Sequence, residues 1–257
     1  MSKISEAFNN KKAFIPFITC GDPDIETTKK IIGELVKNGA DLIELGIPFS
    51  DPTAEGPVIQ SANVRALSKG ITTDDIFEMV AGIRSSVPVP MVFMTYANVV
   101  FSYGMDRFFL RCKETGMDGI ILPDVPYEEK ADFDRSAAAN GIDFISMVAP
   151  TSKERIQKIA AEAKGFIYVV SSLGVTGVRK SVSGNISDIV SSIRKATDIP
   201  CAIGFGISEP KQAREMADIS DGAIVGSAIV RIIGEYGTDA PSHVGEFVKA
   251  MKDALSA

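Results

Sequence analysis

The chain has 257 residues, 45% of them hydrophobic and 23% charged, with a formal net charge of −6. This acidic balance excludes the clustered cations that nucleic-acid binding requires. The single histidine, His243, excludes any mechanism or metal site that needs two histidines. Three dispersed cysteines without a CxxC pair predict neither a disulfide framework nor a zinc site. With no signal peptide and no apolar run near the roughly 18 residues of a membrane span, we expect a cytoplasmic protein.

Eight short apolar runs alternate with helix-sized segments, about 25 to 35 residues apart, which is the size of one βα unit. Near-continuous apolar strands are typical of a parallel sheet that is covered on both faces. The sequence therefore predicts an α/β fold, a single (β/α)8 TIM barrel in which residues 1–257 form one catalytic domain. A doubly wound open sheet is the alternative, although no GxGxxG opens the first βα unit. The expected strands are Ala13–Thr19, Asp41–Ile47, Met91–Tyr96, Gly119–Pro123, Asp143–Pro150, Phe166–Ser171, Cys201–Gly206 and Gly222–Ser227.

The second expected strand carries a carboxylate. Because side chains alternate between the two faces of a strand, Glu44 shares a face with Leu42 and Gly46. That face should point into the barrel, with Glu44 near the end of the barrel where active sites lie. Desolvation there would raise the pKa of Glu44 and let it carry a proton at neutral pH. The alternative is a glutamate that belongs to a buried ion pair.

The loop that follows, from Pro48 to Pro57, holds three prolines and two acids. Prolines restrict φ and stiffen such a loop. A stiff acidic loop over the barrel mouth could supply a second carboxylate, and a solvated turn is the alternative.

The last two βα junctions are rich in glycine, with Gly204–Ser208 in one and Gly226–Ser227 in the other. Glycine lets backbone N–H groups approach an anion closely, and helix N-termini attract phosphate. The loops after strands seven and eight are the usual phosphate site of a TIM barrel. We expect Ser208 and Ser227 to be N-caps of the following helices. Ordinary tight turns are the alternative.

The long polar loop from Ser171 to Gly184 follows the sixth expected strand and contains three glycines. Its length and position predict a lid that closes over bound ligand. The alternative is a connector without such a role.

Several segments together resemble the tryptophan synthase α subunit family, and the resemblance covers the whole chain in order. The longest is ELGIPFSDPTAEGPVIQ, residues 44–60. The shorter ones are FITCGDP (17–23), YANVVF (96–101), PDVP (123–126), GVTG (174–177), GFGIS (204–208) and GSAIV (226–230). The resemblance implies a carbon–carbon lyase that cleaves indole-3-glycerol phosphate to indole and glyceraldehyde 3-phosphate. It implies no metal or cofactor in this chain. The implied partner is a β subunit that carries pyridoxal phosphate, in an α2β2 heterotetramer.

The resemblance also implies roles for single residues. Glu44 would be the general acid/base, and Glu55 would interact with the indole N–H as positive charge develops. Asp51 would lie toward the partner. The residues implied around the substrate are Phe17 and Tyr168 at the indole, Gly177, Phe205, Gly206, Gly226 and Ser227 at the phosphate, and Thr176 in the lid.

At one position the chain departs from the family pattern, which usually has aspartate where this chain has Glu55. One extra methylene shifts a carboxylate by roughly 1 Å, a displacement that can cost about 100-fold in rate. We hypothesise that the loop compensates. Two other functions are alternatives. One is another phosphosugar enzyme such as an isomerase, which needs a catalytic lysine or histidine at a strand end, and none is evident there. The other is a non-catalytic barrel that binds the ligand and activates a partner.

Overall fold

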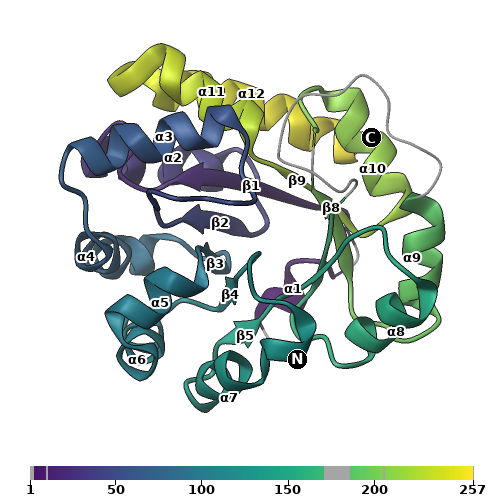
Figure 1. Cartoon of the computed structure of the whole chain (residues 1–257). Coiled ribbons are helices and arrows are strands. Elements are labelled where there is room, and N and C mark those ends of the chain that lie inside the picture. The colour runs from purple at the N-terminus through teal and green to yellow at the C-terminus, as the bar shows by residue number, and fades with distance from the viewer. Residues whose placement is uncertain (1–2, 10, 171–185, 205, 257) are drawn as a thin grey trace.

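The structure is a computed structural model that describes residues 3–9, 11–170, 186–204 and 206–256. Within these residues, nine parallel strands form one sheet in the order β5-β4-β3-β2-β1-β9-β8-β7-β6, and helices surround it (Figure 1). The strands are β1 (Ala13–Thr19), β2 (Ile43–Gly46), β3 (Met91–Met94), β4 (Gly119–Ile121), β5 (Asp143–Phe144), β6 (Ser146–Val148), β7 (Ile167–Val170), β8 (Cys201–Gly204) and β9 (Gly222–Val225).

Helices lie between successive strands except β5 and β6, with further helices before β1 and after β9. They are α1 (Lys3–Glu6), α2 (Ile25–Lys37), α3 (Pro57–Ser68), α4 (Thr73–Ile83), α5 (Ala97–Tyr103), α6 (Met105–Thr115), α7 (Ala131–Ala139), α8 (Lys153–Ala161), α9 (Ile186–Arg194), α10 (Pro210–Ile219), α11 (Ser227–Tyr236) and α12 (Ala240–Ser256). Short 3-10 turns are η1 (Arg84–Ser86), η2 (Tyr127–Glu129) and η3 (Gly237–Asp239). Among the described helices, none is both long and apolar enough to cross a membrane.

The two ends of the sheet are consecutive in the chain. Only Ile145 separates β5, which pairs with β4, from β6, which pairs with β7. The row of strands therefore returns to its starting point, and β5 and β6 together act as one barrel strand. This is the expected (β/α)8 TIM barrel, with eight strand positions around the ring. The prediction of one continuous strand over Asp143–Pro150 was wrong. The strand is interrupted at Ile145, where the pairing changes from β4 to β7.

Most other strands end earlier than their apolar runs. The ladder of β2 stops at Gly46 and that of β9 at Val225, short of the predicted Ile47 and Ser227. Apolar residues beyond these points still pack, so hydrophobicity alone overstates the length of a strand.

Two apolar cores lie on either side of the strands. Ile43 and Leu45 of β2 belong to the outer core under the helices, whereas Leu42 belongs to the core inside the ring. Helix α1 closes the bottom of the ring (Figure 1): Ile4 is fully buried, and Phe8, just after the helix, packs against Phe166 with ring centroids 5.6 Å apart. The barrel is therefore a filled core that is open for chemistry at its other end.

Aspartates tie the strands together at this bottom end. Each stands directly before or near a strand and accepts the backbone N–H of a residue at the start of the neighbouring strand. The pairs are Asp41 with Phe14 at 2.8 Å, Asp118 with Met91 at 3.0 Å, and Asp221 with Cys201 at 2.7 Å. An N–H group at the start of each of β1, β3 and β8 thereby gains a charged acceptor, which is stronger than a neutral one.

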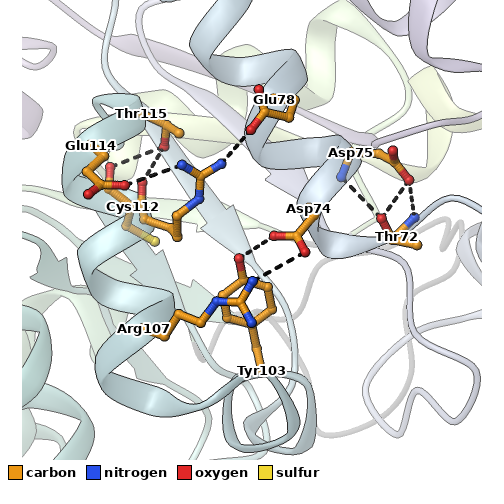
Figure 2. A network of polar contacts seen from close by, with 10 residues as sticks. Thr72, Asp74, Asp75, Glu78, Tyr103, Arg107, Cys112, Glu114 and Thr115 are labelled. Atoms are coloured by element: carbon orange, nitrogen blue, oxygen red, sulfur yellow. Dashed lines mark hydrogen bonds and ion pairs between the residues drawn. The ribbon is translucent and has the colours of Figure 1, made fainter.

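The outer surface beside β3 is held by a polar network between α4, α5 and α6 (Figure 2). Arg111 of α6 donates to Glu78 of α4 at 2.7 Å. The Tyr103 hydroxyl donates to Asp74, and the Arg107 guanidinium lies 4.4 Å from the Tyr103 ring centroid. These contacts are exposed, so each contributes little to stability.

Asp41 offers a test of the bottom ties. Besides Phe14, it binds Lys252 of α12 at 2.5 Å and is almost fully buried. We expect Asp41→Ala to lower the free energy of unfolding by about 2 kcal/mol, because a buried N–H and the ammonium groups of Lys252 and Lys11 lose their acceptor. Urea denaturation measures this, with Asp132→Ala as control because its pair with Arg135 is exposed on both sides. Equal stability of the two variants would contradict the role of Asp41.

Candidate active site

A cavity of about 60 Å³ lies at the carboxyl ends of the strands, where active sites of this fold are found. It lies beside a larger cavity of about 380 Å³, since Ala54, Met94 and Tyr168 line both. The larger cavity is mainly apolar on its inner side, with Leu122 and Met147 among its walls. The smaller one is lined by Phe17, Glu44, Ala54, Glu55, Ile59, Met94, Tyr168, Gly206, Ile207, Ile224, Gly226, Ser227 and Ala228.

Glu44 points into this cavity from β2, as the alternation of the strand predicts. It pairs in register with Phe17 of β1 and is 1% exposed. Neither carboxylate oxygen has a hydrogen-bond partner among the described residues, so the alternative of a buried ion pair finds no support there. Burial, and then the nearby Glu55 carboxylate, raise the pKa of Glu44 to about 8. Glu44 is therefore a carboxylic acid that holds its proton at neutral pH.

Glu55 faces the same cavity from the loop after β2, and its carboxylate has partners. Asn63 Nδ2 donates to Glu55 Oε2 at 2.8 Å, and the Tyr96 hydroxyl binds the same carboxylate. Burial raises the pKa of Glu55, while the hydrogen bonds from Asn63 and Tyr96 act against this rise. The loop is thus no simple solvated turn, because it folds its second acid inward. The two acids therefore differ in environment, because Glu55 has two donors whereas Glu44 has none among the described residues.

Glycines at the ends of strands make room for two aromatic rings. A Cβ on Gly204 would lie 2.6 Å from Tyr168 Cε1, and one on Gly46 would lie 2.7 Å from Phe17 Cζ. Both are closer than real Cβ contacts, so any larger residue would push the ring away. Phe17 and Tyr168 therefore owe their places across the cavity to the missing side chains of neighbouring strands.

The helix after β8 begins differently from the prediction. Pro210 is the first helical residue of α10, and the N-cap is Glu209, so Ser208 is not the N-cap. Gln212 Oε1 accepts the N–H of Ser208 at 2.8 Å and that of Glu209 at 3.2 Å. With its N–H groups engaged and an acid at the cap, this helix end is a poor anion site.

The helix after β9 is better suited to an anion. Its N-cap is Gly226 rather than the predicted Ser227, which is the first helical residue. The end has no side-chain cap and no acid in its first turn. Gly226, Ser227 and Ala228 all line the cavity that holds Glu44. A phosphate bound here would meet free N–H groups and the positive end of the helix dipole.

The other predicted site residues divide into two groups. Phe17, Tyr168 and Gly206 line the cavity with the two acids. Thr176, Gly177, Phe205 and the expected lid from Ser171 to Gly184 lie outside the described residues. Among the described residues, no cluster of histidine, cysteine or acidic side chains could hold a metal ion.

Two functional candidates were missed from the sequence. Tyr96 follows the end of β3, and this position at the barrel top could have singled it out. Asn63 lies on α3, eight residues after Glu55 in the chain. Its contact with Glu55 depends on how the loop before α3 turns. No pattern in the sequence reports that turn.

Two buried acids beside a free helix end, at the active end of a (β/α)8 barrel, define a class of enzyme that moves protons on an anionic substrate. The family model for the tryptophan synthase alpha chain matches residues 4–256. The tryptophan synthase alpha chain of Lacticaseibacillus casei is 48% identical over 257 residues, covering 100% of this chain and 97% of that protein. The chain belongs to the tryptophan synthase alpha chain family.

Solved structures agree with this assignment. The tryptophan synthase subunit alpha of Legionella pneumophila strain Paris superposes with a TM-score of 0.90 at 37% identity, covering 100% of this chain and 99% of that one. The chain from the tryptophan synthase α2β2 complex of Pyrococcus furiosus has a TM-score of 0.88 at 34% identity, covering 95% and 99%.

Proposed function

We propose that Glu44 is the general acid/base with which this chain cleaves indole-3-glycerol phosphate. The cleavage, to indole and glyceraldehyde 3-phosphate in tryptophan biosynthesis, is the lyase reaction of the family to which the chain belongs. The observation that carries the proposal is an inward carboxyl, 1% exposed and without a hydrogen-bond partner among the described residues. Such a group keeps its proton until a substrate accepts it.

The reaction needs two proton transfers, and Glu44 supplies both. It first gives its proton to indole C3, which places positive charge on the ring. Its carboxylate then takes the proton of the hydroxyl on the adjacent glycerol carbon. The O–H electrons form the aldehyde C=O, while the electrons of the breaking C–C bond return to the ring and neutralise it. Glu44 ends protonated, as it began.

Glu55 has the complementary role in this proposal. Its carboxylate accepts hydrogen bonds from Asn63 and Tyr96, which favour its charged form. A negative charge beside the indole N–H stabilises the positive ring that forms when C3 is protonated. The apolar walls around Met94, Phe17 and Tyr168 suit the indole ring.

The substrate phosphate is assigned to the start of α11. Gly226 and Ser227 offer backbone N–H groups there, and Gly206 borders the same cavity. By resemblance to the family, Gly177 and Phe205 would join this site and Thr176 would fold against the strand-two loop. The chemistry needs no metal and no cofactor in this chain.

The chain is proposed to act as one catalytic domain, residues 1–257, in the cytoplasm. Its partner is a tryptophan synthase β subunit that carries pyridoxal phosphate and receives the indole, in an α2β2 heterotetramer. The α2β2 complex of Pyrococcus furiosus supports this assembly. Asp51, which the resemblance places toward the partner, is exposed.

An isomerase that uses lysine or histidine has less support. Among the described residues, neither type lines the cavity that holds Glu44. A barrel that binds the ligand and only activates its partner is separated from the lyase by the next experiment.

Indole release from indole-3-glycerol phosphate tests the role of Glu44. We expect the purified chain to release indole and Glu44→Gln to lose at least about 100-fold in rate, the usual contribution of a positioned acid/base. Glu78→Gln is the matched control, because Glu78 binds Arg111 on the outer surface (Figure 2). If the wild type released no indole, either alone or with a β subunit, the lyase function would be contradicted. Tight substrate binding without turnover would point to the activator.

Glu55→Asp tests the compensation for the longer side chain. The loop places Glu55 Oε2 at 2.8 Å from Asn63, so a shorter side chain would withdraw from its donors by roughly 1 Å. We expect kcat/KM to fall by up to about 100-fold, measured by indole release with Glu78→Asp as control. A hundredfold gain in kcat would show instead that this glutamate impairs the enzyme.

A further inference from the structure

Behind Glu55 lie two buried polar side chains that the proposed proton transfers do not use. Asn63 is 4% exposed and Tyr96 is 2% exposed. Asn63 Nδ2 donates to Glu55 Oε2 at 2.8 Å, and the Tyr96 hydroxyl binds the same carboxylate. Two donors thus converge on one carboxylate from different elements, α3 and the end of β3.

We propose that Asn63 and Tyr96 are positioning residues that hold the Glu55 carboxylate, ionised, against the cavity and allow a glutamate to serve where the family pattern has aspartate. The inference rests on the role proposed above for Glu55. It adds the two residues through which the position and charge of that side chain are set.

Tyr96 is itself fixed by loop residues that precede Glu55. Its hydroxyl accepts the Ala54 N–H at 3.1 Å, and its ring lies 5.2 Å from the ring of Phe49 between centroids. Gln60 Nε2 donates to the backbone oxygen of Glu55 at 2.8 Å. Backbone and carboxylate are therefore both held, which leaves the longer side chain little freedom to swing away from the cavity.

Asn63 is fixed through its helix. Two residues later on α3, Arg65 forms a bidentate pair with Asp22, in which Nε and Nη2 each lie 2.7 Å from a carboxylate oxygen. Asp22 is 1% exposed and belongs to the loop after β1. Bidentate pairs of this kind fix geometry as well as adding energy. The tie therefore joins α3, and Asn63 with it, to the first strand of the barrel.

The same contacts separate the two acids electrically. Both hydrogen bonds act to lower the pKa of Glu55 against the effect of burial, while Glu44 has no donor among the described residues. A proton shared between them therefore rests on Glu44. The described titratable groups that face Glu55 are Glu44 and Tyr168 in the cavity and Tyr96 at its side, with Asp124 behind Tyr96.

Tyr96→Phe is the sharpest test, because it keeps the ring and its packing on Phe49 and removes only the hydroxyl. Loss of a donor to the ionised form raises the pKa of Glu55. We expect the acid limb of the pH profile of kcat/KM to move upward by about one pH unit. The variant should be about tenfold or more slower below this limb, and the deficit should narrow as pH rises.

Tyr103→Phe is the matched control, since its hydroxyl also donates to a carboxylate, that of Asp74, on the outer surface (Figure 2). Its pH profile should equal that of the wild type. A second variant, Asn63→Leu, should show the same upward movement, with kcat reduced more than KM is raised. If Asn63→Leu fails to fold, the Tyr96 pair still decides the matter.

The inference would be overturned if the kcat/KM of Tyr96→Phe had the same pH dependence as that of the wild type, even at a lower rate. The role of Glu44 would then remain intact. Absence of indole release from the wild type would remove the proposed function itself, so the two failures are distinguishable.

Discussion

The site depends on the burial of one carboxyl group without a hydrogen-bond donor. Glu44 is buried inside the barrel, and no described residue donates to it. Burying an ionised carboxylate without a partner is so costly that the group keeps its proton instead. In the proposed reaction, the substrate takes this proton at the open end of the barrel. The second acid of the site, Glu55, differs in having donors, because hydrogen bonds from Asn63 and Tyr96 favour its charged form against the effect of burial.

The contacts that hold the barrel together lie at the end opposite to Glu44. Helix α1 fills the bottom of the ring, and Asp41, Asp118 and Asp221 give charged acceptors to neighbouring strands. Stability is thus concentrated at one end and function at the other, as is usual for this fold. At the functional end, Gly46 and Gly204 have no side chains, and the rings of Phe17 and Tyr168 occupy the space this leaves.

Sequence patterns predicted what depends on local periodicity. The alternation along β2 placed Glu44 inward, and eight apolar runs predicted the barrel. Contacts between distant elements escaped: the apolar run from Asp143 to Pro150 does not reveal that the pairing changes at Ile145. The cap at Glu209 was missed because Gln212 and Pro210 decide it together.

The second acid shows the same limit more sharply. Sequence and family resemblance both drew attention to Glu55, yet neither predicts its donors. Asn63 reaches it only because the loop between β2 and α3 turns back over the barrel mouth, and Tyr96 reaches it from the N-cap of α5, after β3. A one-carbon departure from the family pattern can therefore be interpreted only with these contacts in view.

The central claim is that Glu44 is a protonated acid at neutral pH, and a direct titration tests it. Difference infrared spectroscopy between the wild type and Glu44→Gln isolates the carboxylic C=O band of this one side chain. We expect the band to persist through neutral pH and to disappear with a midpoint at about 8. A band lost near the ordinary carboxyl value of 4.5 would show that Glu44 is ionised in the resting enzyme, and would contradict its assignment as the acid.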